Sequence, residues 1–547
     1  MNIVQSLSIA LPEILLLIGV SVVLLADVLI NGPQIPRDEA THGALHPSGG
    51  GAAQADLTGV LAATRAAGSA TLRVGTAPLS NSAPTTDPAP KMRVQFLALA
   101  ALVLPLLTVI LQSGGGTQFA FSGMYVTDAL ADLLKISCII AVGVTIVYAG
   151  GKPGSYATDR GMGRGEFYAL ALFSLLGEMV MVSASNLLVV YVGLELMTLS
   201  LYALVAMRRD HTQSTEAAVK YFVLGAIASG FLLYGMSMLY GGTGSLDIAT
   251  IAKALASGSA NRTVIVFGVV FVVAALAFKF GAVPFHMWVP DVYQGAPTAA
   301  TLLIAGAPKL AAFGLAFRLL AEGLVAVQAD WQQMLSILAI ASLTLGNFLA
   351  IAQTNLKRVL AYSTIAQIGF VLLGFSVGGP GEGLAEAWGN SAFYIVSYVL
   401  TTLGTFGVIM LAATKGFECD TLDDMKGLSR RAPGIAFTML ILMFSLAGIP
   451  PTIGFYAKLS ILQSVIANGQ LWVAVLAVML SLVGAFYYLR VVKVMYFDAP
   501  ANQPPITAGE GARALLAING AAVVVLGILP GPLMNWCSLA VRQALGY

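Results

Sequence analysis

Four charged residues lie deep within long hydrophobic segments, where charged side chains are rare. They are Glu195, Lys279, Lys309 and Lys458. An ionised side chain at the centre of a bilayer costs about 2.5 to 3.5 kcal/mol, so several of them in one chain require a common reason. Buried Lys and Glu side chains can take up and release protons near neutral pH. These residues therefore predict a proton path through a membrane.

Three other charged residues in hydrophobic segments have different interpretations. We expect Lys135 to pair locally with Asp132, one turn earlier on the same helix. We expect Arg318 to extend its charge to the membrane surface. Lys220 could pair with Glu195 of the preceding span, and opening of that pair would change the proton affinity of both groups.

The composition of the chain is that of a membrane protein. It has 547 residues, of which 58% are hydrophobic and 10% are charged, whereas soluble proteins carry about 25% charged residues. A soluble enzyme is therefore excluded. At about 20 apolar residues per span, hydropathy predicts an all-α polytopic membrane protein with about fourteen transmembrane helices. We place the spans at 9–30, 94–112, 128–150, 166–184, 187–206, 215–240, 264–287, 298–321, 331–352, 356–377, 388–414, 433–467, 470–497 and 513–535.

The chain divides into six parts on this basis. Residues 31–92 are rich in Gly, Ala, Pro, Ser and Thr, and we expect them to form a mobile, low-complexity insertion. The other parts are the first transmembrane helix (1–30), the second and third spans with the following loop (93–165), a first repeat (166–322), a second repeat (331–497), and the last span with the tail (513–547).

Prolines interrupt two spans at matching positions. Pro284 lies in the seventh span, and Pro450 and Pro451 lie in the twelfth. Proline breaks a helix at a cost of about 3 kcal/mol or more, and broken helices at membrane depth need a protein-lined or wet interior. Each break falls in the fourth helix of a five-helix block, spans four to eight and spans nine to thirteen. Blocks of odd length are inverted relative to each other, as in transporters with ion sites at such breaks. An ordinary proline kink explains each break singly but not their matched positions.

Positive charges are distributed unevenly between the two ends of the spans. Of the 28 Lys and Arg residues, 19 lie in loops after odd-numbered spans, 3 lie in the other loops and the tails, and 6 lie within spans. Lys and Arg are retained on the cytoplasmic side. This pattern predicts a multi-pass protein with both termini on the non-cytoplasmic side.

The sequence contains no pattern typical of a metal, cofactor or nucleic-acid site. The cysteines are far apart and form no CxxC pair, and the glycines at 161, 163 and 165 follow no strand, as a dinucleotide fingerprint would require. The net charge of +2 gives no case for nucleic acid. We therefore expect no metal and no cofactor in this chain, and no NADH binding by it. The three cysteines are Cys138, Cys419 and Cys537.

Five motifs resemble the antiporter-like subunits of respiratory complex I, over about residues 94–535. They are NLLVVYVGLEL from Asn186, EAAVKYF from Glu216, FKFGAVPFHMWVPDVYQGAP from Phe278, NLKRVLAYS from Asn355 and GFYAK from Gly454. Within that family, the DVYQGAP sequence and a lysine at 458 are similar to the N-type branch of the bacterial enzyme. Two features depart from the family pattern. Gln367 stands where relatives often have His, so water could carry the proton there. Glu178 is not part of the pattern, and we assign it no role.

The resemblance implies a function and a set of site residues. Protons would pass along Glu195, Lys220, Lys279, Lys309 and Lys458. NADH oxidation and quinone reduction would take place in other subunits, which hold the flavin, the iron-sulfur clusters and the quinone. The expected partners are the membrane-arm subunits M, K, J and A and the lipid bilayer of the bacterial inner membrane.

Other interpretations stay open at this point. His286, directly after the first break, fits either a gate or a capped interior side chain. A subunit of a multisubunit cation/proton antiporter needs the same relay without a redox partner. An assembly scaffold with vestigial charges would tolerate neutral residues at Lys279, Lys309 and Lys458.

Overall fold

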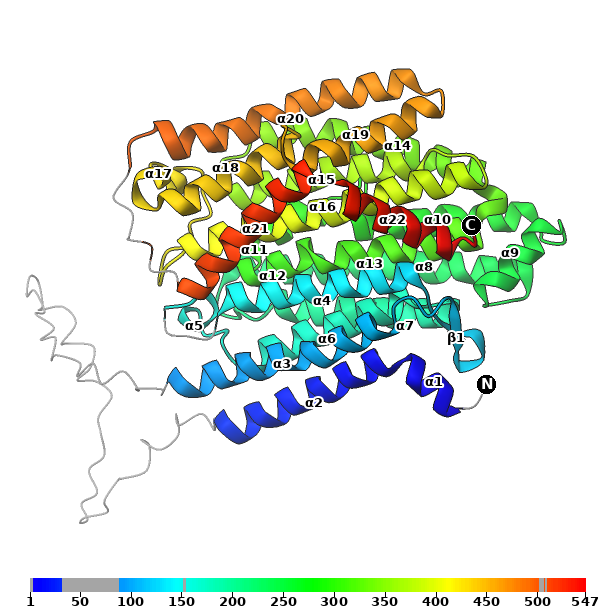
Figure 1. Ribbon diagram of the computed structural model, residues 1–547, viewed down its shortest axis with the longest axis horizontal. Helices are drawn as coiled ribbons and strands as arrows, with labels where there is room; N and C mark the ends of the chain where they lie inside the picture. The colour runs from blue at the N-terminus through cyan, green and yellow to red at the C-terminus, as the bar shows by residue number, and fades with distance from the viewer. Residues whose placement is uncertain (1–2, 32–87, 151–153, 501–505, 507–508) are drawn as a thin grey trace, which may run out of the picture.

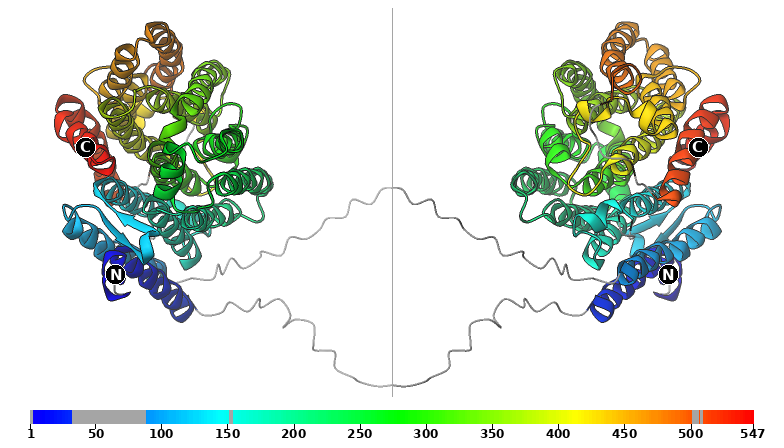
Figure 2. Two further views of the ribbon diagram at one scale, coloured as in Figure 1. Left: turned by 90° about the vertical axis from the view of Figure 1, so that its right-hand side faces the viewer. Right: turned by 90° about the vertical axis from the view of Figure 1, so that its left-hand side faces the viewer.

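The computed structural model describes residues 3–31, 88–150, 154–500, 506 and 509–547. The helices lie side by side along the long axis of one bundle (Figure 1). Viewed end-on, the first helices lie at one edge of the bundle and α20 lies at the opposite edge (Figure 2). The insertion predicted over 31–92 lies outside the described residues, apart from Asn31 and 88–92, which belong to the flanking helices.

The N-terminal part contains five helices and a β-hairpin whose strands pair antiparallel. The elements are α1 (Ile3–Ile9), α2 (Leu11–Asn31), α3 (Pro88–Gln112), β1 (Gln118–Ala120), the short turn η2 (Phe121–Gly123), β2 (Tyr125–Thr127), α4 (Ala129–Ala149) and α5 (Tyr156–Asp159).

The middle part contains the first broken helix. Its elements are α6 (Gly165–Val182), α7 (Leu187–Val205), α8 (Thr212–Thr243), α9 (Ile248–Ala256), α10 (Arg262–Phe280), α11 (Trp288–Gly295), α12 (Thr298–Ala305), α13 (Ala307–Ala316), the π-helical segment η3 (Phe317–Gly323) and the turn η4 (Val325–Val327).

The C-terminal part contains the second broken helix and two outer helices. Its elements are α14 (Gln328–Ile351), α15 (Leu356–Phe375), α16 (Glu382–Ala412), η5 (Asp423–Met425), α17 (Leu428–Arg431), α18 (Pro433–Ala447), α19 (Ile453–Ala467), α20 (Leu471–Phe497), α21 (Glu510–Ile528) and α22 (Gly531–Ala544).

The fold is that of an all-α polytopic membrane protein. Among the described residues, 13 helices are long and apolar enough to cross a membrane. The span predicted over 433–467 consists instead of two shorter apolar helices, α18 and α19. The apolar window within Thr298–Gly323 is completely buried, whereas only 28% of the apolar window of α2 is buried. Residues of the 298–323 stretch therefore lie at the centre of the bundle, and α2 faces outward.

Two buried ion pairs tie the N-terminal helices to each other and to the rest of the bundle, and both differ from the sequence prediction. Lys135 of α4 lies 2.8 Å from Glu13 of α2, so the predicted pairing with Asp132 is wrong. Arg318 is buried and lies 2.7 Å from Asp128, so its predicted extension to the membrane surface is also wrong. Glu13 and Asp128 lie in other elements than the cations that they bind, which local spacing does not reveal, whereas Arg318 also pairs with Glu322 one turn away at 2.5 Å.

Candidate proton path

The first helix break has a glycine at its start and a proline three residues later. Gly281 ends α10 with a φ of 77°, in the left-handed region that favours glycine. The amide of Ala282 then bonds back to the carbonyl of Ala277 at 2.8 Å. Pro284 follows, and helical structure resumes at Trp288. The helix ends four residues before Pro284, the proline at which the sequence predicts a break.

The second break repeats this construction. Gly448 ends α18 with a φ of 84°, and the amide of Ile449 bonds to the carbonyl of Phe444 at 2.9 Å. Pro451 stands three residues after the glycine, as in the first break, and α19 begins at Ile453. Pro450 and Pro451, at which the sequence predicts a break, lie between α18 and α19. Each break leaves backbone carbonyls at the C-terminus of the preceding helix without a partner in that helix.

Lys309 binds these carbonyls at the first break. Its Nζ donates hydrogen bonds to the carbonyls of Lys279 at 3.0 Å and Phe280 at 2.8 Å. The ammonium also lies 5.3 Å from the ring centre of Trp288. A cation at a helix C-terminus is stabilised by the helix dipole. The hydrogen-bond acceptors of the Lys309 Nζ are thus backbone carbonyls.

A third helix interruption determines the position of Lys309, and it was not predicted from the sequence. The eighth span divides at Gly306 into α12 and α13, and Lys309 stands in the first turn of α13. The signal for this division was present, because Gly306 is followed by Pro308, which fits the start of a helix.

Lys458 occupies the corresponding position at the second break. Its Nζ donates to the carbonyls of Leu446 at 2.9 Å and Ala447 at 3.0 Å, and to the hydroxyl of Ser481 at 2.9 Å. The ring centre of Phe370 is 5.3 Å away. Lys309 and Lys458 therefore make equivalent contacts with the ends of two different broken helices.

Gln367 of α15 reaches the same helix end as Lys458. Its amide nitrogen donates to the carbonyl of Leu446 at 2.9 Å and to the hydroxyl of Tyr488 at 3.0 Å. The hydroxyl of Tyr394 donates to its amide oxygen. Gln367 is thus held by direct contacts with protein groups.

Lys279 and Glu195 differ from Lys309 and Lys458 because each has a buried charged-group atom without a hydrogen-bond partner among the described residues. Within the described part of the chain, the Nζ atom of Lys279 and the Oε1 atom of Glu195 are buried, and neither has a hydrogen-bond partner. The charge of Glu195 acts on Lys279, and no ion pair within 4 Å joins them. The two groups are near enough to influence each other, and each retains room for another partner.

Lys220 pairs with two other carboxylates and not with Glu195, the partner that the sequence suggested. Its Nζ lies 2.8 Å from Asp291 and 2.8 Å from Glu216. Asp291 also binds Arg358 of α15 at 2.7 Å. The side chain of Lys220 is 42% exposed, so it extends toward the end of the bundle and away from the interior. Asp291, Glu216 and Arg358 are site residues that sequence reasoning missed.

A cavity of about 200 Å³ adjoins this cluster. Its walls include the four charged residues and two glutamines, Gln213 and Gln294. Such a polar cavity can hold several water molecules. The charged cluster of Lys220, Glu216, Asp291 and Arg358, which we call the mouth cluster, therefore lies where water reaches the protein.

His286 lies in the first break, and the Nδ1 atom of its half-buried ring has no hydrogen-bond partner among the described residues. Its role as a gate stays a prediction. In the described part of the chain, no group of three or more His, Cys, Asp or Glu residues could hold a metal ion.

Comparisons with known proteins find relatives over most of the chain. A family described as NADH:quinone oxidoreductase/Mrp antiporter, TM, matches residues 184–484. NADH-quinone oxidoreductase subunit N of Herminiimonas arsenicoxydans is 58% identical over 457 residues, which cover 82% of this chain and 92% of that protein.

Solved structures also match. A chain of respiratory complex I from Thermus thermophilus with bound aureothin is 32% identical, with a TM-score of 0.69; the match covers 81% of this chain and 94% of that one. A chain of the Mrp complex from Dietzia sp. DQ12-45-1b is 20% identical, with a TM-score of 0.72 and coverage of 84% and 94%. The second likeness shows the fold alone.

Proposed function

Because this chain belongs to the family of NADH-quinone oxidoreductase subunit N, the antiporter-like membrane subunits of complex I, we propose which of its residues carry the proton. The chain is a multi-pass, proton-translocating membrane-arm subunit of this translocase. The proton path consists of Glu195, Lys220, Lys279, Lys309 and Lys458. NADH oxidation and quinone reduction take place in other subunits, which hold the flavin, the iron-sulfur clusters and the quinone.

The observation that carries this proposal is the pair of lysines at the broken helix ends. Lys309 and Lys458 each donate two hydrogen bonds to carbonyls at such an end. A hydrogen bond to a charged group contributes about 1.5 to 3 kcal/mol. Moving one charge against 100 mV costs about 2.3 kcal/mol. Making or breaking these bonds therefore changes the free energy by the amount that proton translocation requires.

The proton enters at the mouth cluster and reaches Lys279 near Glu195. Lys309 takes the proton next, because its Nζ binds the carbonyls at the end of the helix that carries Lys279. The mouth cluster controls the first step, since Lys220 can bind Glu195 only after it leaves Asp291. His286 acts as a gate beside the first break.

The second stage runs laterally from Lys309 to Lys458 between α15 and α16. Buried hydroxyl groups line this route: Tyr398 donates to Thr364 at 2.8 Å, and Thr401 and Ser445 are 3.2 Å apart. A small cavity of about 10 Å³ lies among Gln367, Tyr398 and neighbouring residues. That volume is close to the minimum for one water molecule. The proton then leaves on the outer side.

The architecture proposed for this function is a pair of inverted five-helix repeats. The repeats are 166–322 and 331–497, and α18 with α19 form a fourteenth, broken span. The shared glycine-to-proline spacing of the two breaks supports the repeat. Both ends of the chain lie on the non-cytoplasmic side of the bacterial inner membrane, and the described N-terminal helix and the C-terminus lie at the same end of the bundle (Figure 1). The neighbours are the other complex I subunits, among them M, K, J and A.

Substitution of Lys279 by alanine tests the path. In the assembled complex, we expect Lys279→Ala to abolish proton-coupled NADH:quinone turnover, measured with a pH-sensitive dye in sealed vesicles. Lys253→Ala is a matched control, because Lys253 lies exposed on α9 outside the path. Unchanged coupling in an assembled Lys279→Ala complex would refute the assignment and favour an assembly scaffold.

Purification in mild detergent tests the alternative of a multisubunit cation/proton antiporter. We expect the chain to migrate with subunits that contain flavin and iron-sulfur clusters. Migration only with other antiporter-like subunits would assign cation/proton exchange to the chain and leave the relay unchanged.

A further inference from the structure

Glu178 of α6 lies in the interior of the bundle, and the path proposed above does not use it. Its side chain is fully buried. The Oε1 atom accepts a hydrogen bond from the hydroxyl of Ser174 at 3.0 Å, and the Oε2 atom has no hydrogen-bond partner among the described residues. No Lys, Arg or His side chain in the described part of the chain forms an ion pair with it. The carboxyl group is therefore buried without a cation.

These surroundings favour a neutral carboxylic acid at Glu178. An isolated carboxylate in an apolar interior costs so much free energy that the group takes up a proton instead. An ionised carboxylate also needs hydrogen-bond donors at both oxygens, and Ser174 supplies a donor for one. The thiol of the neighbouring Cys138 donates its hydrogen to the carbonyl of Ala307 at 3.6 Å, so this hydrogen is not available to Glu178. A proton on the carboxyl group removes the need for a second donor.

Cys138 connects this acid to the helix interruption that determines the position of Lys309. Ala307, whose carbonyl accepts the thiol hydrogen, is the first residue of α13, and Lys309 stands two residues later. The helix α13 packs against both α4, which carries Cys138, and α6, which carries Glu178. Glu178 therefore lies beside the segment that holds one of the lysines of the path.

A buried acid–base pair lies one helical turn further along α4, toward the end of the bundle that carries the N-terminal helix (Figure 1). We call this the outer end. Lys135 precedes Cys138 by three residues, so the two side chains lie on one face of α4. The Nζ atom of Lys135 lies 2.8 Å from Oε1 of Glu13 and donates to the hydroxyl of Tyr125 at 2.7 Å. Glu13 belongs to the first turn of α2, so this pair lies between Glu178 and the outer end.

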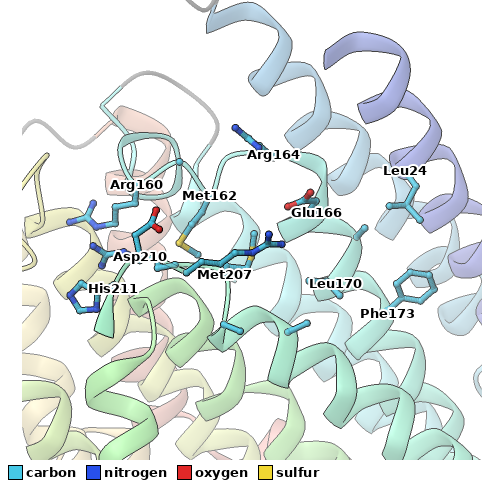
Figure 3. Close-up of a pocket in the computed structure, with 16 residues that line it drawn as sticks. Leu24, Arg160, Met162, Arg164, Glu166, Leu170, Phe173, Met207, Asp210 and His211 are labelled. Atoms are coloured by element: carbon cyan, nitrogen blue, oxygen red, sulfur yellow. The ribbon is translucent and has the colours of Figure 1, made fainter. Parts of the chain in front are cut away.

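The other glutamate of α6 has different surroundings. Glu166 is exposed in the first turn of this helix and lines a cavity of about 870 Å³ together with Arg164 (Figure 3). Arg160 and Asp210 line the same cavity. Water and neighbouring cations stabilise an ionised carboxylate there. Glu178 lies about 18 Å further along the helix, where neither is present among the described residues.

We propose that Glu178 carries protons from Lys309 to the outer end of the bundle, as a release route in addition to the lateral one. This inference rests on the proton path proposed above. Lys135 gives one ammonium proton to the carboxylate of Glu13 and takes the proton of Glu178 in its place. The acid formed at Glu13 releases its proton at the outer end, and the ammonium of Lys309 protonates Glu178 again.

Infrared spectroscopy of the assembled complex tests this proposal, because a neutral carboxylic acid and a carboxylate absorb at different frequencies. Spectra of the wild type and of Glu178→Gln are compared at rest and during turnover with NADH and quinone. We expect a neutral-acid band in the wild type that decreases during turnover and is lost in Glu178→Gln. Glu166→Gln is the matched control on the same helix. Because Glu166 is exposed, its substitution should leave the neutral-acid band in place.

Two results would overturn the proposal. One is a Glu178→Gln spectrum in which no neutral-acid band is lost. The other is a band that stays constant during turnover, which would make Glu178 a structural acid. Lys279→Ala distinguishes these results from failure of the path itself. If the path holds, this variant should keep the band at rest and lose its response to turnover, whereas full proton coupling in Lys279→Ala refutes the path whatever Glu178 does.

Two further variants test the neighbours of Glu178. Cys138→Ala should shift the frequency of the neutral-acid band, because the thiol lies beside the carboxyl group. This variant also serves if Glu178→Gln does not assemble, and an unshifted band would count against the proposal. Glu13→Gln removes the carboxylate that accepts the proton of Lys135, so the band should persist and lose its response to turnover. An undiminished response would refute release through Lys135 and Glu13.

Discussion

At the scale of single residues, Asp291 determines the position of Lys220. Its two oxygens bind Lys220 at 2.8 Å and Arg358 at 2.7 Å. In Asp291→Asn the anion between these cations is lost, and Lys220 keeps only its ion pair with Glu216. Ion pairs of this half-exposed kind contribute up to about 1 kcal/mol each, so we expect coupled turnover to fall about 5-fold to 10-fold. The measurement is proton-coupled turnover of the assembled complex across pH.

The matched control for this prediction is Asp330→Asn. Asp330 pairs at 3.5 Å with Arg262 and lies 27% exposed, outside the mouth cluster. The Asp330→Asn variant should leave proton coupling unchanged. Asp291→Glu should restore part of the activity, because it keeps the charge. Full activity in Asp291→Asn would show that the position of Lys220 does not limit proton uptake.

The residue types of the path were predictable from the sequence, but their partners were not. Lys279, Lys309 and Lys458 are conspicuous because charge is rare in hydrophobic segments. Asp291 stands in a polar link between spans, where a carboxylate is ordinary. Its partners Lys220 and Arg358 lie far from it in the sequence, and only folding brings the three together.

At the scale of elements, the two breaks depend on glycines with positive φ. A Cβ atom at Gly448 would lie 2.9 Å from Cδ of Lys458 and would also be strained at a φ of 84°. We expect Gly448→Ala to displace the lysine from its carbonyls and to lower stability by about 1 to 2 kcal/mol. Coupled turnover should fall strongly, as measured in vesicles that contain the assembled complex.

Gly416→Ala is the control for the backbone effect. Gly416 has a φ of 79° and nothing lies within 4 Å of its added Cβ atom. Gly416→Ala should lower stability to about the same extent as Gly448→Ala and leave proton coupling intact. If both variants reduced coupling equally, backbone strain alone would explain the loss, and the contact of Gly448 with Lys458 would have no role.

The two breaks could be predicted from the sequence because proline is rare inside helices. It lacks the N–H that would donate a helical hydrogen bond, and its ring clashes with the preceding turn. The division at Gly306 was less visible. Pro308 lies in the first turn of α13, where proline is tolerated, and hydropathy is continuous across it. A hydropathy plot measures burial and length, and it is therefore insensitive to a short interruption inside a fully buried stretch.

At the scale of the whole molecule, Glu418 joins three loops at one end of the bundle. Its carboxylate binds Arg160 at 2.8 Å and Arg208 at 2.7 Å, and it accepts a hydrogen bond from Tyr156 at 3.0 Å. The arginines belong to the loops before α6 and α8, and Glu418 follows α16. Composition predicted the bundle, but it contained no information on this connection between the N-terminal, middle and C-terminal parts.

We expect Glu418→Gln to lower the melting temperature of the purified complex, because nearly buried Arg160 loses its anion. Loss of a hydrogen bond to a charged group corresponds to about 1.5 to 3 kcal/mol. Asp423→Asn is the control, since the pair of Asp423 with Lys426 is largely exposed and contributes little. Equal melting temperatures for Glu418→Gln and the wild type would contradict this role.

The effect of Glu418 depends on pH in a defined direction. Burial alone would raise the pKa of its carboxyl, but the hydrogen bond and charge of Arg160, with Lys357 and Arg208, hold the pKa below the ordinary value of 4.5. The stabilisation is present above the unfolded pKa and is lost as the pH falls through the folded one. The melting temperatures of wild type and Glu418→Gln should therefore differ at neutral pH and converge only when the pH falls below the lowered pKa of Glu418 in the folded protein.

The acceptors of Lys309 and Lys458 are backbone carbonyls, with one serine hydroxyl added at Lys458. Side-chain replacement at positions 279, 280, 446 and 447 leaves these oxygens in place as long as the helices end where they do. A saturation mutagenesis map of the protein should consequently show intolerance at the glycines that end the helices, whereas substitutions at Phe280, Leu446 and Ala447, which are buried, should act through packing and leave the lysine acceptors in place. The carbonyl sites that bind the two lysines are thus formed by the backbone, so the side chains around them can change in evolution without loss of these acceptors.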